Sequence, residues 1–123
     1  MSCSSDIEQI RQALTAYYHA LYYGRPEKLE EAFRPDAILL GDVDGNESRL
    51  DQTQYRKLLQ TRVSPHAQGE PYRLQIGEIR LCGNAAMAEL QTPLAGKVFT
   101  DYVSLFKRQG RWRIAFKLYS HPQ

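Results

Sequence analysis

The sequence predicts an α+β fold in which helices cover one face of an antiparallel β-sheet. Apolar residues recur at helical spacing in residues 5–23 and again after residue 51, whereas from residue 72 onward they alternate as in β-strands. Turn signals at residues 83–84 and 108–110, with a third between them, divide this second part into four strands. Helices followed by consecutive strands are typical of α+β proteins rather than of alternating α/β proteins.

Two helices are expected before the first strand. Ser5 and Glu8 form a capping box at the start of the longest helix, and Gly24 suits the left-handed residue that ends it. A second, short helix is expected to begin at Pro26, because proline fits the first turn of a helix, and to end at Pro35.

A short strand and a third helix follow. Residues 37–40 predict a brief strand, and residues 41–48 predict a stretch of turns. Asp51 is suited to cap the third helix, which Ser64 and Pro65 are expected to end. The expected order is therefore helix, helix, strand, helix, and then four strands in a meander.

In the strand region, the alternation of apolar and polar residues shifts once by one position. Apolar residues alternate on one face over residues 72–76, but Ile79 has the opposite parity. A β-bulge near Gly77 and Glu78 is therefore expected to restore its face. Residues 83–84, Gly-Asn, then form a two-residue hairpin turn.

Length and composition limit the class of protein. The chain has 123 residues, 42% of them hydrophobic and 24% charged, which predicts one globular domain spanning residues 1–123. A net charge of +2 with scattered basic residues gives no reason to expect nucleic acid as a partner, and no apolar run is long enough to span a membrane. Cys3 and Cys82 form no motif and no export signal is recognisable, so we expect a cytoplasmic protein without a disulfide.

The last predicted hairpin, residues 99–121, places two opposite charges within an apolar sheet. If residues 108–110 form the loop, antiparallel pairing puts Asp101 directly opposite Lys117. Charges at such a position need a reason, because burying an unpaired charge is costly. Two interpretations are open: the pair faces a pocket and takes part in its chemistry, or it only fixes the register of the strands. A four-residue loop would shift the register by one and separate the two side chains.

Two groups of residues carry a resemblance that covers nearly the whole chain. They are Tyr22, Tyr23, Gly24, Pro26, Phe33, Pro35, Asp36 and Ala37, and then Phe99, Asp101, Tyr102, Leu105, Gly110, Arg111, Trp112, Arg113, Ile114 and Lys117. In their order and spacing the chain resembles the nuclear transport factor two-like superfamily, which includes ketosteroid isomerase and polyketide cyclases. Within this superfamily it is most similar to the lumazine-binding-like proteins.

The resemblance implies a particular architecture. The expected fold is a cone-shaped, curved antiparallel β-sheet wrapped around a long N-terminal helix, with two shorter helices, that is, a cystatin-like α+β barrel. It also implies an open-ended apolar pocket, which would take a small-molecule ligand, and a homodimer formed through the outer face of the sheet.

A concave apolar pocket with a few polar groups is the default place for a ligand in such a fold. We expect its lining to include Tyr17, Leu21, Phe99, Asp101, Lys117 and Tyr119. Tyr17, counted back from Gly24, matches the place at which ketosteroid isomerase carries the tyrosine that donates to the developing oxyanion. Asp101 is the candidate general base, with Lys117 favouring the charged form of its carboxyl group.

The resemblance to ketosteroid isomerase fails at the residues that would carry its reaction. The position of its general base falls on Gly41, with Asp42 one residue further along, and the position of its protonated acid falls on Tyr102, with Asp101 adjacent. One step along a strand reverses the direction of a side chain, so neither aspartate fits without a bulge. We therefore do not expect steroid isomerisation.

The remaining polar residues indicate neither a metal site nor a cofactor. His19, His66 and His121 lie in separate predicted elements without metal-ligand spacing. Residues 42–46 resemble the start of a calcium loop but are not followed by the glycine and glutamate that such a loop needs, so we expect a polar turn. His121 shares the parity of Lys117 and could face the pocket, but so close to the end of the chain we interpret it as a frayed terminus.

Three functions are candidates on the sequence alone. The first is the binding of a small, partly apolar molecule, with aromatic and heterocyclic compounds as candidates. The second is an isomerase, cyclase or dehydratase in which Asp101 is the base and Tyr17 donates a hydrogen bond to an oxyanion. The third is a non-catalytic dimeric interaction module whose cavity is filled by side chains.

Overall fold

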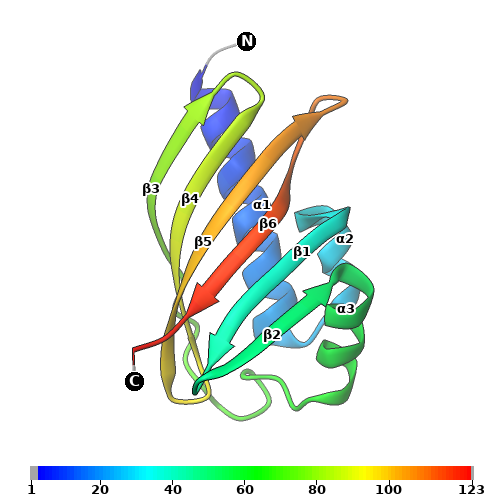
Figure 1. Cartoon of the computed structure of the whole chain (residues 1–123), viewed down its shortest axis with the longest axis vertical. Coiled ribbons are helices and arrows are strands. Elements are labelled where there is room, and N and C mark those ends of the chain that lie inside the picture. The colour runs from blue at the N-terminus through cyan, green and yellow to red at the C-terminus, as the bar shows by residue number, and fades with distance from the viewer. Residues whose placement is uncertain (1–2, 123) are drawn as a thin grey trace.

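Three α-helices and six strands make up the part of the chain that the computed structural model describes, residues 3–122 (Figure 1). The helices are α1 (Cys3–Tyr23), α2 (Leu29–Ala32), which directly follows a 3₁₀ turn (Pro26–Lys28), and α3 (Gln52–Thr61). The strands are β1 (Phe33–Val43), β2 (Asn46–Asp51), β3 (Gln75–Cys82), β4 (Ala85–Leu94), β5 (Lys97–Arg108) and β6 (Arg111–Ser120). No helix within these residues is long and apolar enough to cross a membrane.

The strands form one curved sheet in the order β2-β1-β6-β5-β4-β3, and α1 runs along one of its faces (Figure 1). The predicted meander of four antiparallel strands is present as β3 to β6. Its predicted bulge near Gly77 and Glu78 is confirmed as a register shift in β3, and Gly83 and Asn84 form the turn into β4. The α+β fold is therefore confirmed, with one addition: β1 pairs with β6 in parallel, so the sheet is mixed.

β1 and β2 are the part of the sheet that the sequence analysis underestimated. β1 covers 11 residues rather than only 37–40, and the stretch 41–48 that was predicted to be turns is mostly strand. Asp44 and Gly45 alone form the turn, with φ angles of 55° and 85°, which is the left-handed geometry that Asp-Gly favours in tight hairpins. β2 was missed because its sequence, residues 46–51, is polar and forms an exposed edge of the sheet.

The helix ends follow some of the capping signals and not others. Gly24 has a φ angle of 66° at the end of α1, and Asp51 caps α3 in a full capping box with Gln54, both as predicted. α1 begins before Ser5, so this serine lies inside the first turn and is not the cap. The second helix is shorter than predicted, because the chain becomes extended at Phe33.

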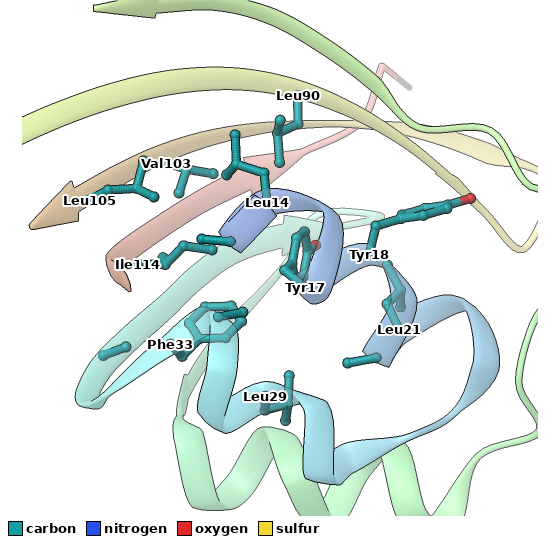
Figure 2. Close-up of a cluster of buried hydrophobic side chains, with 14 of the residues drawn as sticks. Leu14, Tyr17, Tyr18, Leu21, Leu29, Phe33, Leu90, Val103, Leu105 and Ile114 are labelled. Atoms are coloured by element: carbon teal, nitrogen blue, oxygen red, sulfur yellow. The ribbon is translucent and has the colours of Figure 1, made fainter. Parts of the chain in front are cut away.

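The hydrophobic core lies between α1 and the inner face of the sheet. Figure 2 shows α1 between the strands, which contribute Leu90, Val103, Leu105 and Ile114, and the α2 segment, which contributes Leu29. Small side chains on β4, Ala86 and Ala88, are buried as part of this core. Burial alternates along β4 and β5, so their inner side chains are the ones that can reach α1.

The β5–β6 hairpin has a different register from the predicted one. Its turn consists of Gln109 and Gly110 alone, and further along the hairpin Asp101 lies opposite Tyr119 while Lys117 lies opposite Val103. The prediction that Asp101 and Lys117 lie directly opposite each other is therefore wrong by two residues. Because side chains alternate with a period of two, a shift of two still leaves both charges on the same face.

A bulge in β6 at Ala115 determines which of its side chains face inward. Ile114 pairs with Leu105, but Phe116 pairs with the preceding residue of β5, so Ala115 is an extra residue. Ile114 is buried before the bulge, and Lys117 is buried after it while Phe116 is exposed. Without the extra residue, alternation would turn the lysine outward.

The connection between α3 and β3, residues 62–74, is held against the end of α1 by two tyrosines. Tyr22 donates a hydrogen bond to the backbone carbonyl of Glu70. The hydroxyl of Tyr18 accepts one from the backbone N–H of Arg73 at 3.1 Å. These contacts give a defined position to a long connection that starts directly after α3.

Candidate functional site

A cavity of about 300 Å³ lies between the C-terminal half of α1, the helix α3, the start of β5 and the end of β6, and its wall is mostly apolar. The structure brings together in this one cavity all six side chains that the sequence predicted to line a pocket: Tyr17, Leu21, Phe99, Asp101, Lys117 and Tyr119. Sequence reasoning missed five further polar residues of the wall, which are Ser48, Tyr55, Arg62, Thr92 and Lys97. Tyr55 and Arg62 come from α3 and its end, Thr92 comes from β4, and Ser48 and Lys97 come from β2 and β5.

Tyr17 connects the two buried charges of the cavity. Lys117 Nζ donates to the hydroxyl oxygen of Tyr17 at 2.7 Å, and the same hydroxyl donates its proton to Asp101 Oδ2 at 2.8 Å. Thr92 donates a weaker, 3.4 Å hydrogen bond to the same carboxylate oxygen. Asp101 and Lys117 make no direct ion pair among the described residues, and at 1% and 4% exposure neither can rely on bulk water. The phenol of Tyr17 is therefore the bridge through which the opposite charges are paired.

The ammonium group of Lys117 is surrounded by tyrosine rings. Its nitrogen lies 4.4 Å from the ring centre of Tyr119, 4.6 Å from that of Tyr17 and 5.3 Å from that of Tyr55. Burial lowers the pKa of Lys117, and the negative charge of Asp101 acts in the opposite direction. The electron-rich faces of the rings favour a cation at this place.

The two tyrosines nearest to these charges are held in their protonated form. Burial raises the pKa of Tyr17 well above its usual value, and the negative charge of Asp101 raises it further. Burial raises the pKa of Tyr55 to about 12. Both phenols are therefore neutral hydrogen-bond donors at neutral pH.

Arg62 of the cavity wall has unpaired buried donor atoms, although a side-chain hydrogen bond from it acts to lower the pKa of Tyr55. It is the first residue after α3, and its Nε and Nη2 atoms are buried without a hydrogen-bond partner among the described residues. Each such unpaired donor costs about 1–3 kcal/mol. The positive charge of Arg62 lies close enough to lower the pKa values of Tyr17, Tyr55 and Lys117.

A sequence signal for Arg62 existed. Tyr55, Leu58, Leu59 and Arg62 are spaced i, i+3, i+4 and i+7, so the arginine continues the apolar face of the third helix. An arginine at the end of such a face points toward the same interior as the apolar side chains before it. The signal needed the helix to be placed against the pocket, which the sequence alone did not do.

Gly41, the residue to which the sequence resemblance assigned the position of the ketosteroid isomerase base, has a structural role. It pairs with Tyr119 across β1 and β6, and the ring of Tyr119 lies directly over it. A Cβ atom on Gly41 would come within 2.3 Å of that ring. The absence of a side chain therefore lets Tyr119 lie flat against the strand as part of the cavity wall.

His121 does not form a frayed end, and that interpretation was wrong. Its side chain is buried, its Nε2 accepts a hydrogen bond from the backbone N–H of Asp44 at 3.1 Å, and its ring packs against Phe99 at 5.1 Å. The residue does not line the cavity but ties the end of the chain to the β1–β2 turn. That turn is polar, as predicted, and Asp42 accepts a hydrogen bond from the backbone N–H of Gly45 within it. Within residues 3–122, no group of three or more histidine, cysteine, aspartate and glutamate side chains could hold a metal ion.

Solved structures with the same architecture show the class of fold to which the chain belongs. An NTF2-like protein of unknown function from Silicibacter pomeroyi DSS-3 is 23% identical, with a TM-score of 0.87, and the match covers 99% of this chain and 100% of the other. A second one, from Shewanella baltica OS155, is 22% identical with a TM-score of 0.86, covering 100% of this chain and 98% of the other. A structure described as a "putative dehydratase from the NTF2-like family", from Streptomyces avermitilis, is 15% identical with a TM-score of 0.66, covering 99% of both chains. At these identities the likeness shows the fold alone, which is NTF2-like.

The family follows from the sequence itself. The model of the family described as "Putative lumazine-binding" matches residues 5–120. The chain belongs to this family, which confirms the resemblance found in the sequence. No curated protein matches the chain.

The bridge through Tyr17 predicts that the two buried charges depend on each other. We expect Asp101→Asn and Lys117→Met each to lower the free energy of unfolding by about 3–5 kcal/mol, because each leaves a buried charge without its counterpart. The double variant should lose less than the sum of the two, which unfolding in urea measures. Asp36→Asn, which removes an exposed carboxylate paired with Arg34, is the matched control and should change little. Strictly additive losses would mean that the two charges do not interact.

The raised phenol pKa values predict a loss of stability in alkali. An unfolded tyrosine releases its proton near pH 10, whereas Tyr55 in the folded protein keeps its proton to about pH 12. The folded state binds more protons in this window, so the free energy of unfolding falls as the pH rises. Tyr55→Phe should make the fall shallower by about 1.4 kcal/mol per pH unit. Urea unfolding across the window measures this, with Tyr23→Phe at the end of α1 and outside the cavity as the control, and equal slopes in all three proteins would contradict it.

Proposed function

We propose that the protein binds a small, partly apolar molecule in the cavity between α1, α3 and the sheet. The observation that supports this most is an unfilled space of about 300 Å³ with a mostly apolar wall, at the lower end of the range of ligand pockets. A few buried polar groups, those of Tyr17, Asp101 and Lys117, lie on that wall and would orient a ligand. The rings of Phe99 and Tyr119 favour an aromatic or heterocyclic compound, since they offer flat apolar surface.

Binding is favoured over an isomerase, cyclase or dehydratase by the state of Tyr17. A phenol has one proton, and that of Tyr17 is donated to Asp101, so it is not free to stabilise an oxyanion. The carboxylate of Asp101 keeps one oxygen, Oδ1, without a partner among the described residues and could accept a hydrogen bond from a ligand. The name of the Streptomyces avermitilis protein concerns that protein, and a shared fold does not carry a reaction with it.

A purely structural interaction module is less well supported. Such a module would fill the interior of the cone with side chains, because empty apolar space is destabilising. Here α3 and the strands leave a space next to three buried polar side chains, which is unfavourable unless a ligand or water uses it.

We further propose that the protein is a homodimer formed through the outer face of the sheet. Large apolar side chains on this face are between 37% and 50% exposed: Met87, Val98, Tyr102, Phe116 and Leu118. They come from the three neighbouring strands β4, β5 and β6. An apolar surface of this extent is typical of an interface, and a second copy of the same chain is the usual partner.

The cavity proposal is tested by closing the cavity. Leu58 lines the cavity and is 39% exposed, so Leu58→Trp should fill the opening without disturbing the core. Native mass spectrometry of the protein purified from its own host should detect a co-purified compound that Leu58→Trp no longer carries. Val63→Trp is the matched control, because Val63 is 62% exposed, lies near the same helix end and does not line the cavity. A compound retained equally by all three proteins, or none in any of them, would contradict the proposal.

The dimer proposal is tested by placing a charge on the outer face. Leu118→Glu should convert the protein from dimer to monomer, because a carboxylate would be buried against an apolar partner surface. Sedimentation velocity measures the mass in solution. Gln12→Glu, an exposed position on α1, is the control and should leave the dimer intact. An unchanged sedimentation coefficient for Leu118→Glu, or a monomeric parent protein, would rule out this interface.

A further inference from the structure

Lys117 differs from other lysines of the chain in what surrounds its nitrogen. Lys28, Lys97 and Lys107 each form an ion pair with a carboxylate. The nitrogen of Lys117 contacts no carboxylate among the described residues, and instead donates to the hydroxyl of Tyr17 and lies over three tyrosine rings. This ammonium is therefore buried without a counter-ion in direct contact.

The nitrogen of Lys117 lies at the wall of the cavity. The three tyrosines whose ring centres are 4.4–5.3 Å from it, Tyr17, Tyr55 and Tyr119, all line that cavity, as does Lys117 itself. Only 4% of the lysine is exposed. A molecule inside the cavity can thus reach the nitrogen, whereas bulk water has little access to it.

The two hydrogen bonds of Tyr17 give the ammonium a route by which to lose a proton. Both bonds run in the same direction, from Lys117 to Tyr17 and from Tyr17 to Asp101. If Tyr17 takes a proton from the nitrogen and gives its own proton to Oδ2, the two buried charges become an amine and a carboxylic acid. Burial favours such neutral forms.

The amine is the nucleophilic form of a lysine. Burial lowers the pKa of Lys117, although the charge of Asp101 opposes this, so burial increases the share of amine. Removal from water in an apolar pocket is a common way in which proteins make a lysine reactive toward carbonyl groups at neutral pH.

We propose that Lys117 binds small carbonyl compounds, namely aromatic aldehydes and ketones, covalently and reversibly as an imine. This inference rests on the proposed function and names the class of ligand. The apolar wall, including Leu21 and Phe99, takes the body of the compound, and the volume of about 300 Å³ suits one or two rings. The carbonyl carbon then lies next to the lysine nitrogen.

The step conserves charge and needs no oxidant or reductant. The amine attacks the carbonyl carbon, so that a C–N bond forms while the C=O π bond breaks, and one proton moves from nitrogen to oxygen. The oxygen then leaves as water with a second proton, which Asp101 returns through Tyr17. Overall, ammonium and carbonyl compound become iminium and water. Because the iminium carries the same single positive charge as the ammonium, the tyrosine rings and Asp101 stabilise both.

Trapping the imine by reduction tests this inference. The parent protein is incubated at neutral pH with benzaldehyde and cyanoborohydride, which reduces an imine to a stable amine, and peptide mass spectrometry locates the benzyl groups. We expect Lys117 to be labelled at least about tenfold faster than the exposed Lys57, because a fall of one unit in pKa provides about ten times more amine. Lys97, which lines the same cavity but is paired with Asp44, should react like Lys57.

Three variants separate reaction within the cavity from reaction elsewhere. Leu58→Trp, which closes the opening, should slow the labelling of Lys117 and leave that of Lys57 unchanged, whereas Val63→Trp should behave as the parent does. Lys117→Arg keeps the positive charge but forms no imine. It should bind benzaldehyde no more tightly than benzyl alcohol, which lacks the carbonyl group. Urea midpoints show whether each variant is folded, and the labelling of the parent protein needs no variant.

Other results would overturn the inference. Equal labelling of Lys117 and Lys57, or no label on Lys117, would exclude an imine-forming lysine. Labelling of Lys117 that Leu58→Trp leaves unchanged would mean that the reagent does not arrive through the cavity. In each of these cases, a compound that co-purifies with the parent and is lost on Leu58→Trp would still support the proposed function, so the two failures are distinguishable.

Discussion

The site depends on one hydroxyl group, that of Tyr17, which accepts from an ammonium and donates to a carboxylate. Removing these charges from water costs several kcal/mol for each ion, and hydrogen bonds to charged groups recover about 1.5–3 kcal/mol each. Tyr17 comes from the middle of α1, whereas Asp101 and Lys117 come from neighbouring strands, so the two bonds also fix how the helix is rotated over the sheet. The geometry of the cavity next to them follows from that fixed rotation.

The sequence was sufficient for the fold and for the inner face of the last hairpin, but not for its register. The alternation of side chains along the strands placed Asp101 and Lys117 on the same face. The turn is one residue shorter than assumed, which shifts the pairing by one residue, and the bulge at Ala115 shifts it by one more. A total shift of two residues changes the direct partners but leaves each side chain on its predicted face, so the predicted cavity residues meet although the predicted pairing is wrong. Alternation of apolar residues reports which face a side chain occupies, and it reports neither the length of a turn nor the place of a bulge in a strand that is apolar on both faces.

The residues that the sequence did not identify are those whose surroundings come from distant parts of the chain. β2 is polar and gave no strand signal, and Arg62 looks like an ordinary surface arginine until α3 is placed against the mouth of the cone. The tyrosines posed the opposite difficulty: eight of them occur in the chain, and the sequence does not distinguish those that line a pocket from those that only pack in the core. Only the contact of Tyr17 and Tyr55 with Lys117 distinguishes their role from that of rings that merely fill the core.

The extra residue at Ala115 has a consequence for how the two surfaces of β6 relate to each other. Past this residue the strand turns Phe116 and Leu118 outward and Lys117 and Tyr119 inward, so alternate side chains of one short segment belong to both faces of the molecule. Such a segment cannot shift along its axis without moving both sets together. The four consecutive residues 116–119 therefore contribute to both the cavity wall and the outer face of the sheet. An insertion or deletion in this segment would change both surfaces at once, so evolution can alter one surface only within the limits that the other allows.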